Sequence, residues 1–124
     1  MTQKTEGVQL QLTWGRCIGN RWCRLDTVDL SNEVFDGLEG VYLIWHGGNQ
    51  FVYVGQGDIR DRLGRHRNDP RIQAYAESGL YTSWASVPAR QRDGVETYLS
   101  EVCQPLVGER RPDAVPIKVN LPGD

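Results

Sequence analysis

The sequence has few of the features that mark secreted, membrane-spanning or disordered proteins. Its longest uninterrupted apolar run, residues 41–45, is far too short to cross a bilayer. Residues 1–7 hold no apolar core that could serve as a secretion signal. Hydrophobic residues make up 39% and charged residues 24% of the 124 positions, which argues against disorder. We therefore expect one soluble, cytoplasmic domain without a membrane-bound part.

Cysteine is scarce and odd in number. Cys17, Cys23 and Cys103 form no Cys-x-x-Cys pair, so the spacing that zinc sites and redox motifs need is missing. A secreted disulfide framework would have an even count. We expect all three cysteines to be reduced and structural.

Net charge is also small, at −2, so the total does not indicate a nucleic-acid-binding protein. The basic residues are nevertheless concentrated within twelve positions of the middle of the chain. These residues are Arg60, Arg62, Arg65, His66, Arg67 and Arg71. By charge alone, a surface for an anionic partner and a solvated helix face are equally good interpretations.

What the sequence does contain is an alternation of strand and helix patterns. Residues 8–14 and 21–30 alternate apolar and polar positions around the turn-forming residues 15–20, which predicts an N-terminal β-hairpin. Residues 31–40 form a connector. Two apolar strands follow at residues 40–45 and 50–55.

The link between these two strands, residues 46–49, contains paired glycines that accept the positive φ of hairpin turns. A loop symmetric about the glycines would place Tyr42 directly opposite Tyr53. Both side chains would then lie on one face of the sheet.

Helices are predicted over residues 59–68 with Asp58 as N-cap, over residues 71–77, and over residues 89–103. Residues 81–87 read as a third strand, residues 104–116 as a loop, and residues 117–119 as a last short strand. The chain is thus expected to be α+β. A small central three-stranded antiparallel sheet is flanked by helices, with residues 1–37 as a hairpin extension and residues 38–124 as the main domain.

Two tripeptides make the pattern specific: Gly-Val-Tyr at residues 40–42 and Tyr-Val-Gly at residues 53–55. Four further residues follow in a fixed order: Arg62, His66, Glu96 and Asn120. This arrangement resembles the GIY-YIG nuclease superfamily over residues 38–122. Each of these six sequence elements alone is weak evidence for the family, whereas all six in the family's order are strong evidence.

The resemblance implies a metal-dependent endonuclease that hydrolyses phosphodiester bonds in nucleic acid, in DNA rather than RNA. Glu96 would hold one Mg²⁺ or Mn²⁺ ion, because Mg²⁺ binds through one carboxylate together with substrate phosphate. Arg62 and His66 are four residues apart, so a helix places them on one face. The permanent charge of Arg62 suits a developing negative charge on phosphorus. Without the family pattern, a surface salt bridge would be preferred for Arg62.

The family usually has one tyrosine activate the water, and we assign this role to Tyr42 with Tyr53 as its partner. A free phenol has a pKa near 10, so metal or Arg62 must lower it. Either tyrosine alone would more simply be a packed strand aromatic. Gln56 occupies a position where the family often has lysine or serine, so we expect no assisting cation there.

Nucleic-acid contacts are assigned to Arg60, Arg65, Arg67, Arg71 and Asn120. The alternative function is a catalytically weak or inactive nucleic-acid-binding module of the same fold. A structural or protein-interaction role has only the four tryptophans in its favour. Specificity is left to loops such as residues 104–116, to the N-terminal hairpin or to a partner protein. A homodimer is possible, and the hairpin could extend the sheet, bind substrate or form a dimer edge.

Overall fold

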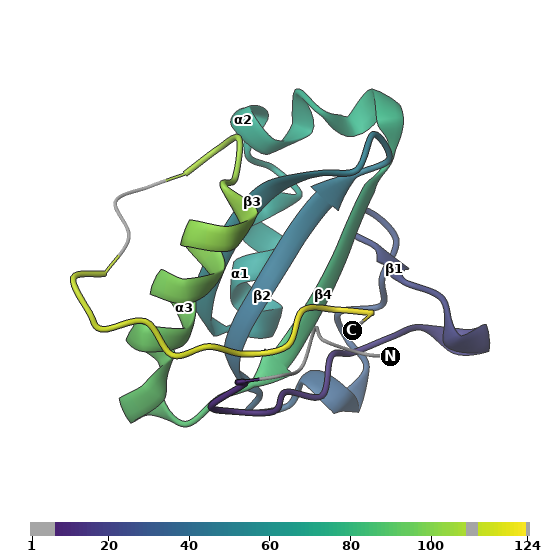
Figure 1. The fold of residues 1–124 in the computed structure, drawn as a ribbon. Coiled ribbons are helices and arrows are strands. Elements are labelled where there is room, and N and C mark those ends of the chain that lie inside the picture. Colours follow the sequence, from purple (N-terminus) through teal and green to yellow (C-terminus); the bar gives the residue numbers. More distant parts are fainter. Residues whose placement is uncertain (1–6, 109–111, 124) are drawn as a thin grey trace.

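The computed structural model describes residues 7–108 and 112–123. They form an α+β fold with a four-stranded antiparallel sheet in the order β1-β4-β2-β3 (Figure 1). The strands are β1 (Cys23–Arg24), β2 (Glu39–His46), β3 (Gln50–Asp58) and β4 (Leu80–Ser86). The α-helices are α1 (Ile59–His66), α2 (Pro70–Gln73) and α3 (Ala89–Cys103), and short 3₁₀ turns are η1 (Ile18–Asn20), η2 (Glu33–Phe35) and η3 (Ala76–Ser78).

Strand β2 lies in the interior of the sheet between β4 and β3. Its apolar run is buried at consecutive positions, as expected of a strand covered on both faces. Helix α3 packs on one face and α1 on the other (Figure 1). The sheet therefore separates two hydrophobic clusters.

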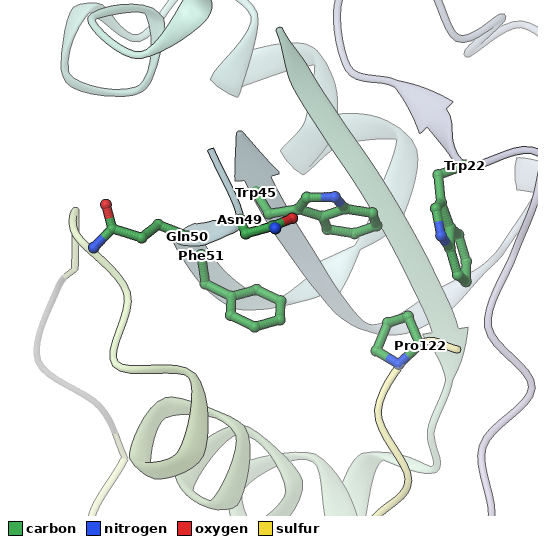
Figure 2. A pocket seen from close by; sticks show the side chains of 6 residues that line it. All are labelled: Trp22, Trp45, Asn49, Gln50, Phe51 and Pro122. Atoms are coloured by element: carbon green, nitrogen blue, oxygen red, sulfur yellow. The ribbon is translucent and has the colours of Figure 1, made fainter. Parts of the chain in front are cut away.

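On the α3 face, Val41 and Leu43 of β2 pack with Val95 and Leu99 of α3. This cluster continues to the β2–β3 turn, where Trp22, Trp45 and other side chains surround a cavity (Figure 2). The C-terminal segment joins the same face through Val119.

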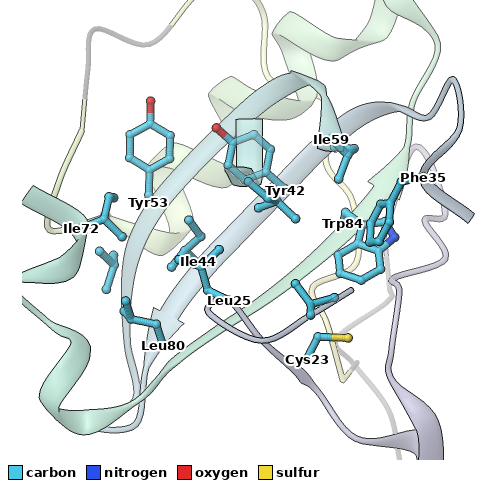
Figure 3. Packing of buried hydrophobic residues seen from close by; sticks show 13 residues of the cluster. Cys23, Leu25, Phe35, Tyr42, Ile44, Tyr53, Ile59, Ile72, Leu80 and Trp84 are labelled. Carbon is cyan, nitrogen blue, oxygen red and sulfur yellow. The ribbon is translucent and has the colours of Figure 1, made fainter. Parts of the chain in front are cut away.

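On the α1 face, Tyr42 and Ile44 of β2 pack with Ile59 and Leu63 of α1. Tyr53 belongs to the same cluster, and its hydroxyl points in the same general direction as that of Tyr42 (Figure 3). Alternation along β2 thus assigns the two motif tyrosines to the face covered by α1.

The predicted N-terminal hairpin is wrong. Within the described residues, 8–14 make no ladder with 21–30, and the antiparallel bridge in this region joins Cys17 to Arg21. Leu10 instead pairs with Val119 of the C-terminal segment. The alternation in residues 8–14 reflects burial of Leu12 and Trp14 on one side of an extended segment. Strand β1 joins the edge of β4, so the sheet has four strands where three were expected.

The expectation of three reduced cysteines is also wrong. Cys17 and Cys23 form a disulfide across a separation of six residues, while Cys103 is free and buried. Burial raises the pKa of the Cys103 thiol to about 12, so it stays protonated at neutral pH. The absence of a Cys-x-x-Cys motif did not exclude a disulfide, because two cysteines at another spacing can still meet across a tight turn.

The β2–β3 hairpin has a different register from the symmetric one. Tyr42 lies opposite Gly55, and Tyr53 lies opposite Ile44. The positive φ of the turn is adopted by Asn49, at 67°, and not by Gly47 or Gly48. Gly47 is needed for space, because a Cβ there would overlap the carbonyl oxygen of Ser78. A shift of two residues preserves the faces, so both tyrosines still lie on one side.

The helix predictions are largely confirmed. Helix α3 covers the predicted residues, and α1 begins after its Asp58 N-cap, whose side chain accepts a hydrogen bond from the backbone N–H of Asp61. The predicted helix at 71–77 is divided into α2 and η3, and residues 117–119 contribute one bridge in place of a strand. Residues 109–111 of the predicted loop lie outside the described residues. In the described part of the chain, every helix is too short or too polar to cross a membrane.

Candidate active site

The two tyrosines of the motifs come together by diagonal pairing of neighbouring strands. Their rings are stacked, with centroids 6.1 Å apart and an interplanar angle of 19°. Such a diagonal neighbour is within reach of aromatic side chains. Tyr42 is completely buried and Tyr53 is 3% exposed.

The glycines of the two tripeptides make this packing possible. A Cβ on Gly55 would lie 2.5 Å from Cζ of Tyr42, so the glycine provides the space that the phenol ring occupies. A Cβ on Gly40 would overlap the carbonyl oxygen of Ala85 on β4. The motif glycines are therefore steric requirements of the hairpin and of its pairing with β4.

Helix α1 brings His66 to the same point. The Tyr42 hydroxyl and Nε2 of His66 are 2.6 Å apart, and the His66 ring lies 4.4 Å from that of Tyr53 between centroids. Ile59, Leu63 and His66 form the buried stripe of this helix at helical spacing. A histidine on the apolar stripe is thus directed inward at the two phenols.

Arg62 lies one turn before His66 and interacts with the hydroxyl groups of both tyrosines. These interactions raise the pKa of Arg62, which stays charged at every physiological pH. Its Nε atom is buried and has no hydrogen-bond partner among the described residues. Burial raises the pKa of Tyr42 well above its ordinary value, and Arg62 offsets this effect only in part. Tyr42 therefore remains protonated at neutral pH.

Glu96 reaches this region from α3. One of its carboxylate oxygens accepts a hydrogen bond of 2.8 Å from Nε2 of Gln56 on β3. The same nitrogen donates to Asp93, also at 2.8 Å. The negative charge of Glu96 contributes to the raised pKa of Tyr42, so Glu96 lies within electrostatic range of that phenol. A cavity of about 400 Å³ is lined by Tyr53, Glu96 and residues of the segment after α3.

The chemistry of these donors fits one hydrated hard cation better than a closed metal cage. No group of three or more His, Cys, Asp or Glu side chains with metal-ligand geometry occurs in residues 7–108 and 112–123. Glu96, with Asp93 held beside it by Gln56, offers carboxylate oxygen at the rim of a cavity. Mg²⁺ is typically bound in this way, keeping several waters and completing its shell with substrate phosphate.

The basic cluster divides into two pairs with different surroundings. Arg60 donates to the backbone oxygens of Leu30 and Asn32, and Arg67 donates to those of Leu25 and Val28. These two arginines attach α1 to the N-terminal segment. Their hydrogen-bonding groups thus have a structural role, and their assignment as nucleic-acid contacts stays a prediction.

Arg65 and Arg71 are the more exposed pair. Arg65 pairs with Asp61 at 3.2 Å and Arg71 with Asp69 at 2.9 Å, with arginine side chains 68% and 54% exposed. The exposed Arg65–Asp61 pair is weak, so a phosphate can compete for the guanidinium of Arg65. Arg71 donates to both carboxylate oxygens of Asp69, whose side chain is only 18% exposed, so this pair is held more firmly. The assignment of Arg65 and Arg71 as nucleic-acid contacts stays a prediction.

Asn120 lies in the interior and not at a nucleic-acid interface. It is 4% exposed, its side-chain oxygen accepts from the N–H of Leu12, and its amide donates to the Leu12 carbonyl. Its own carbonyl accepts from the indole of Trp14. Asn120 thus fastens the C-terminal segment to the N-terminal one, and the prediction that it contacts nucleic acid is not supported by its position.

Gln56 and Asp93 were not identified as site residues from the sequence. Gln56 was noted only as a departure from the family pattern; it lies three residues after Tyr53 and therefore on the opposite sheet face, where it reaches Glu96 and Asp93 of α3. Asp93 precedes Glu96 by three residues on a helix, a spacing that puts two side chains on one face. That spacing is the sequence signal that could have identified Asp93 as a neighbour of Glu96.

Comparisons with known proteins add no assignment. No protein-family model matches this chain, and neither curated proteins nor solved structures give a match.

Proposed function

We propose that this protein is a metal-dependent endonuclease that hydrolyses phosphodiester bonds, in DNA in preference to RNA. The observation that carries the proposal is the convergence of Tyr42, Tyr53, Arg62 and His66 beside a cavity lined by Glu96. These residues come from two strands and two helices. A purely structural core would have no need of a half-buried arginine, a buried histidine and a carboxylate at one point.

Glu96 would hold one Mg²⁺ or Mn²⁺ ion, with Asp93 as a neighbouring carboxylate. When bound, this cation supplies charge neutralisation at the phosphate and lowers the pKa of a coordinated water. Gln56 fixes one oxygen of Glu96 and thereby orients the carboxylate. Arg62 binds the phosphoryl oxygens, where its permanent charge stabilises the additional negative charge of the transition state.

The roles of the two tyrosines are assigned in the opposite sense to the family-based expectation. Tyr42 has no exposed surface and a raised pKa, so it is poorly suited to take a proton from water. Tyr53 lines the cavity together with Glu96. We assign the hydrogen bond to the attacking water to Tyr53, whereas Tyr42 orients His66 through the 2.6 Å contact.

The test is incubation of the purified chain with supercoiled plasmid, with Mg²⁺ and with excess chelator. Nicked or linear product that forms only with the metal supports the proposal. A panel of duplex, single-stranded and branched DNA and RNA then identifies the substrate. Absence of cleavage on the entire panel in Mg²⁺ and in Mn²⁺ would rule out the enzyme.

A nucleic-acid-binding module without activity is the second candidate. The deep burial of Tyr42, Tyr53 and His66 favours it, because substrate has little direct access to these side chains. Binding to DNA that weakens as salt rises, with no cleavage in either metal, would support this alternative. Cleavage by the wild-type chain would exclude it.

A further inference from the structure

A second cavity lies on the opposite sheet face from Tyr42 and Tyr53, at the end of the β2–β3 hairpin. Its volume is about 250 Å³, and Figure 2 shows aromatic side chains around it. The lining residues come from three distant parts of the sequence: Trp22, Trp45, Asn49, Gln50, Phe51 and Pro122. Trp22 and Trp45 meet edge to face at 5.6 Å, and Phe51 lies 6.3 Å from Trp45 between ring centroids.

A β-bulge directs Phe51 into this cavity. The pairing passes from Ile44 opposite Tyr53 to Trp45 opposite Phe51, so Val52 is the extra residue. Val52 and Tyr53 therefore both belong to the cluster on the α1 face, while Phe51 belongs to the α3 face. Bulges commonly redirect a side chain in this way. One strand thus contributes to the candidate active site and to the aromatic cavity.

The cavity also contains a polar group suited to recognition. Asn49 holds the turn with φ of 67°, and its amide side chain is among those that line the cavity (Figure 2). No described residue hydrogen-bonds this amide. A carboxamide offers two donors and an acceptor, which matches the edge of a nucleobase. The amide of Gln50 points away from the cavity in the same view.

Two arginines lie against aromatic rings that line the cavity or stack on its lining. The guanidinium of Arg16 lies 3.9 Å above the ring of Trp22. Arg24 lies 5.5 Å above Tyr81, which itself stacks on Trp45 at 6.2 Å. None of the residues that line the cavity is acidic. The walls are therefore apolar and aromatic, whereas the surroundings favour an anion.

We propose that this cavity binds an unpaired nucleobase of a single-stranded nucleic acid. The base stacks on Phe51 and meets the edge of Trp45, because these two rings are inclined by 67°. Its own edge meets the amide of Asn49, and its phosphate lies toward Arg16. Stacking alone would also suit a neutral sugar, but a neutral sugar gains nothing from the two arginines. The inference uses none of the residues assigned to cleavage and stands independently of the nuclease proposal.

The test is a titration of the intact chain with a short single-stranded oligothymidine in excess chelator. Tryptophan fluorescence monitors the binding. Phe51→Leu removes a stacking ring, and Asn49→Gly removes the amide while keeping the positive φ that the turn requires. Tyr75→Leu is the matched control, because Tyr75 is a partly buried aromatic that packs on the other cluster. Thermal unfolding of each variant verifies its fold.

We expect saturable quenching, with binding weakened roughly five- to a hundredfold by Phe51→Leu, less by Asn49→Gly and not by Tyr75→Leu. Equal binding of an abasic oligomer would overturn the proposal, because only charge would then be recognised. Tighter binding of a neutral oligosaccharide would overturn it as well. Because metal is absent from the titration, a failed cleavage assay and a failed binding assay remain separate results.

Discussion

Tyr42 and Tyr53 occupy mirror-image positions in their two tripeptides but lie in different surroundings. Tyr42 contacts His66 and Arg62 and packs directly against Gly55, and none of its surface is exposed to solvent. Tyr53 has the same neighbours and also borders the cavity of Glu96. Access to water, and not residue type, is what separates their proposed roles.

Phenylalanine substitutions test this separation. We expect Tyr53→Phe to lower the cleavage rate by about a hundredfold or more with little change in melting temperature, because only a proton-handling hydroxyl is removed. Tyr42→Phe leaves buried Nε2 of His66 without its 2.6 Å contact and should cost about 1–2 kcal/mol of unfolding free energy. Single-turnover rates and thermal unfolding measure the two effects. Full activity in Tyr53→Phe, together with a large rate loss in stable Tyr42→Phe, would restore Tyr42 as the activating group.

The raised pKa of Tyr42 has a consequence for stability at alkaline pH. The unfolded chain releases this proton at a pH near 10, whereas the folded chain retains it. Stability from this group is thus present below pH 10 and is lost as pH rises further. Absorbance titration of phenolate should show fewer ionised tyrosines in the folded chain than in the urea-unfolded chain at the same pH. Ionisation of all five tyrosines near pH 10 in a folded chain would contradict this prediction.

At the scale of elements, the pairing of β2 with β4 depends on close approach of their backbones. Gly40 faces Ser86 in the register of β2 with β4, and its Cα leaves no room for a methyl group. Gly64, in α1, has only Leu30 within van der Waals contact of an added Cβ, at 3.9 Å. Two glycines in adjacent elements therefore predict opposite responses to the same substitution.

Gly40→Ala should lower the free energy of unfolding by about 2–3 kcal/mol, because the methyl group collides with the backbone of β4. Gly64→Ala should raise it by up to about 1 kcal/mol, because alanine is the better helix former and meets no obstacle. Urea unfolding of both variants measures the difference. A neutral Gly40→Ala would mean that β2 and β4 are farther apart than described.

Local signals predicted several elements correctly. Helix α3 and the Asp58 cap follow from helical spacing and capping chemistry, and the common face of the tyrosines follows from strand alternation. The register was wrong by two residues because the positive φ belongs to Asn49 and because Val52 forms a bulge. Neither the positive φ of Asn49 nor the bulge at Val52 can be read from the alternation of apolar and polar residues.

The parts of the site that could not be predicted depend on long-range contacts. Arg60 and Arg67 read as phosphate ligands by charge, but their partners are carbonyl groups about thirty to forty residues earlier in the sequence. The pairing of Leu12 with Asn120 spans 108 positions. Gln56 can hydrogen-bond Glu96 only because α3 packs against β3 in the folded chain. Charge and spacing within one segment do not determine such contacts.

At the scale of the molecule, the N-terminal segment described from residue 7 to residue 37 is part of both cores. Leu12 and Trp14 pack on the α3 face, while Leu25, Val28 and Phe35 pack on the α1 face. The Cys17–Cys23 disulfide closes the loop between these two parts and carries Trp22, which lines the aromatic cavity. The segment that was expected to be an appended hairpin therefore connects the two faces of the sheet.

Reduction of this disulfide should lower the free energy of unfolding by about 2 kcal/mol, because the unfolded chain regains the freedom of a short loop. Urea unfolding with and without reductant measures the effect, with the Cys17→Ala/Cys23→Ala double variant as the check. Alkylation of the unfolded, unreduced chain should modify one thiol, that of Cys103. Modification of three thiols would show that the pair is not bonded in the isolated protein.

The central claim is tested most directly by the cleavage rate of Glu96→Gln, measured on plasmid in Mg²⁺ beside the wild-type chain. The matched control is Glu101→Gln, which makes the same change on an exposed position of the same helix. We expect Glu96→Gln to lose about three orders of magnitude or more in rate while it keeps its melting temperature and its affinity for DNA, because a metal ligand is lost. Glu101→Gln should cleave like the wild type. Comparable cleavage by Glu96→Gln, or wild-type cleavage that survives excess chelator, would contradict the account.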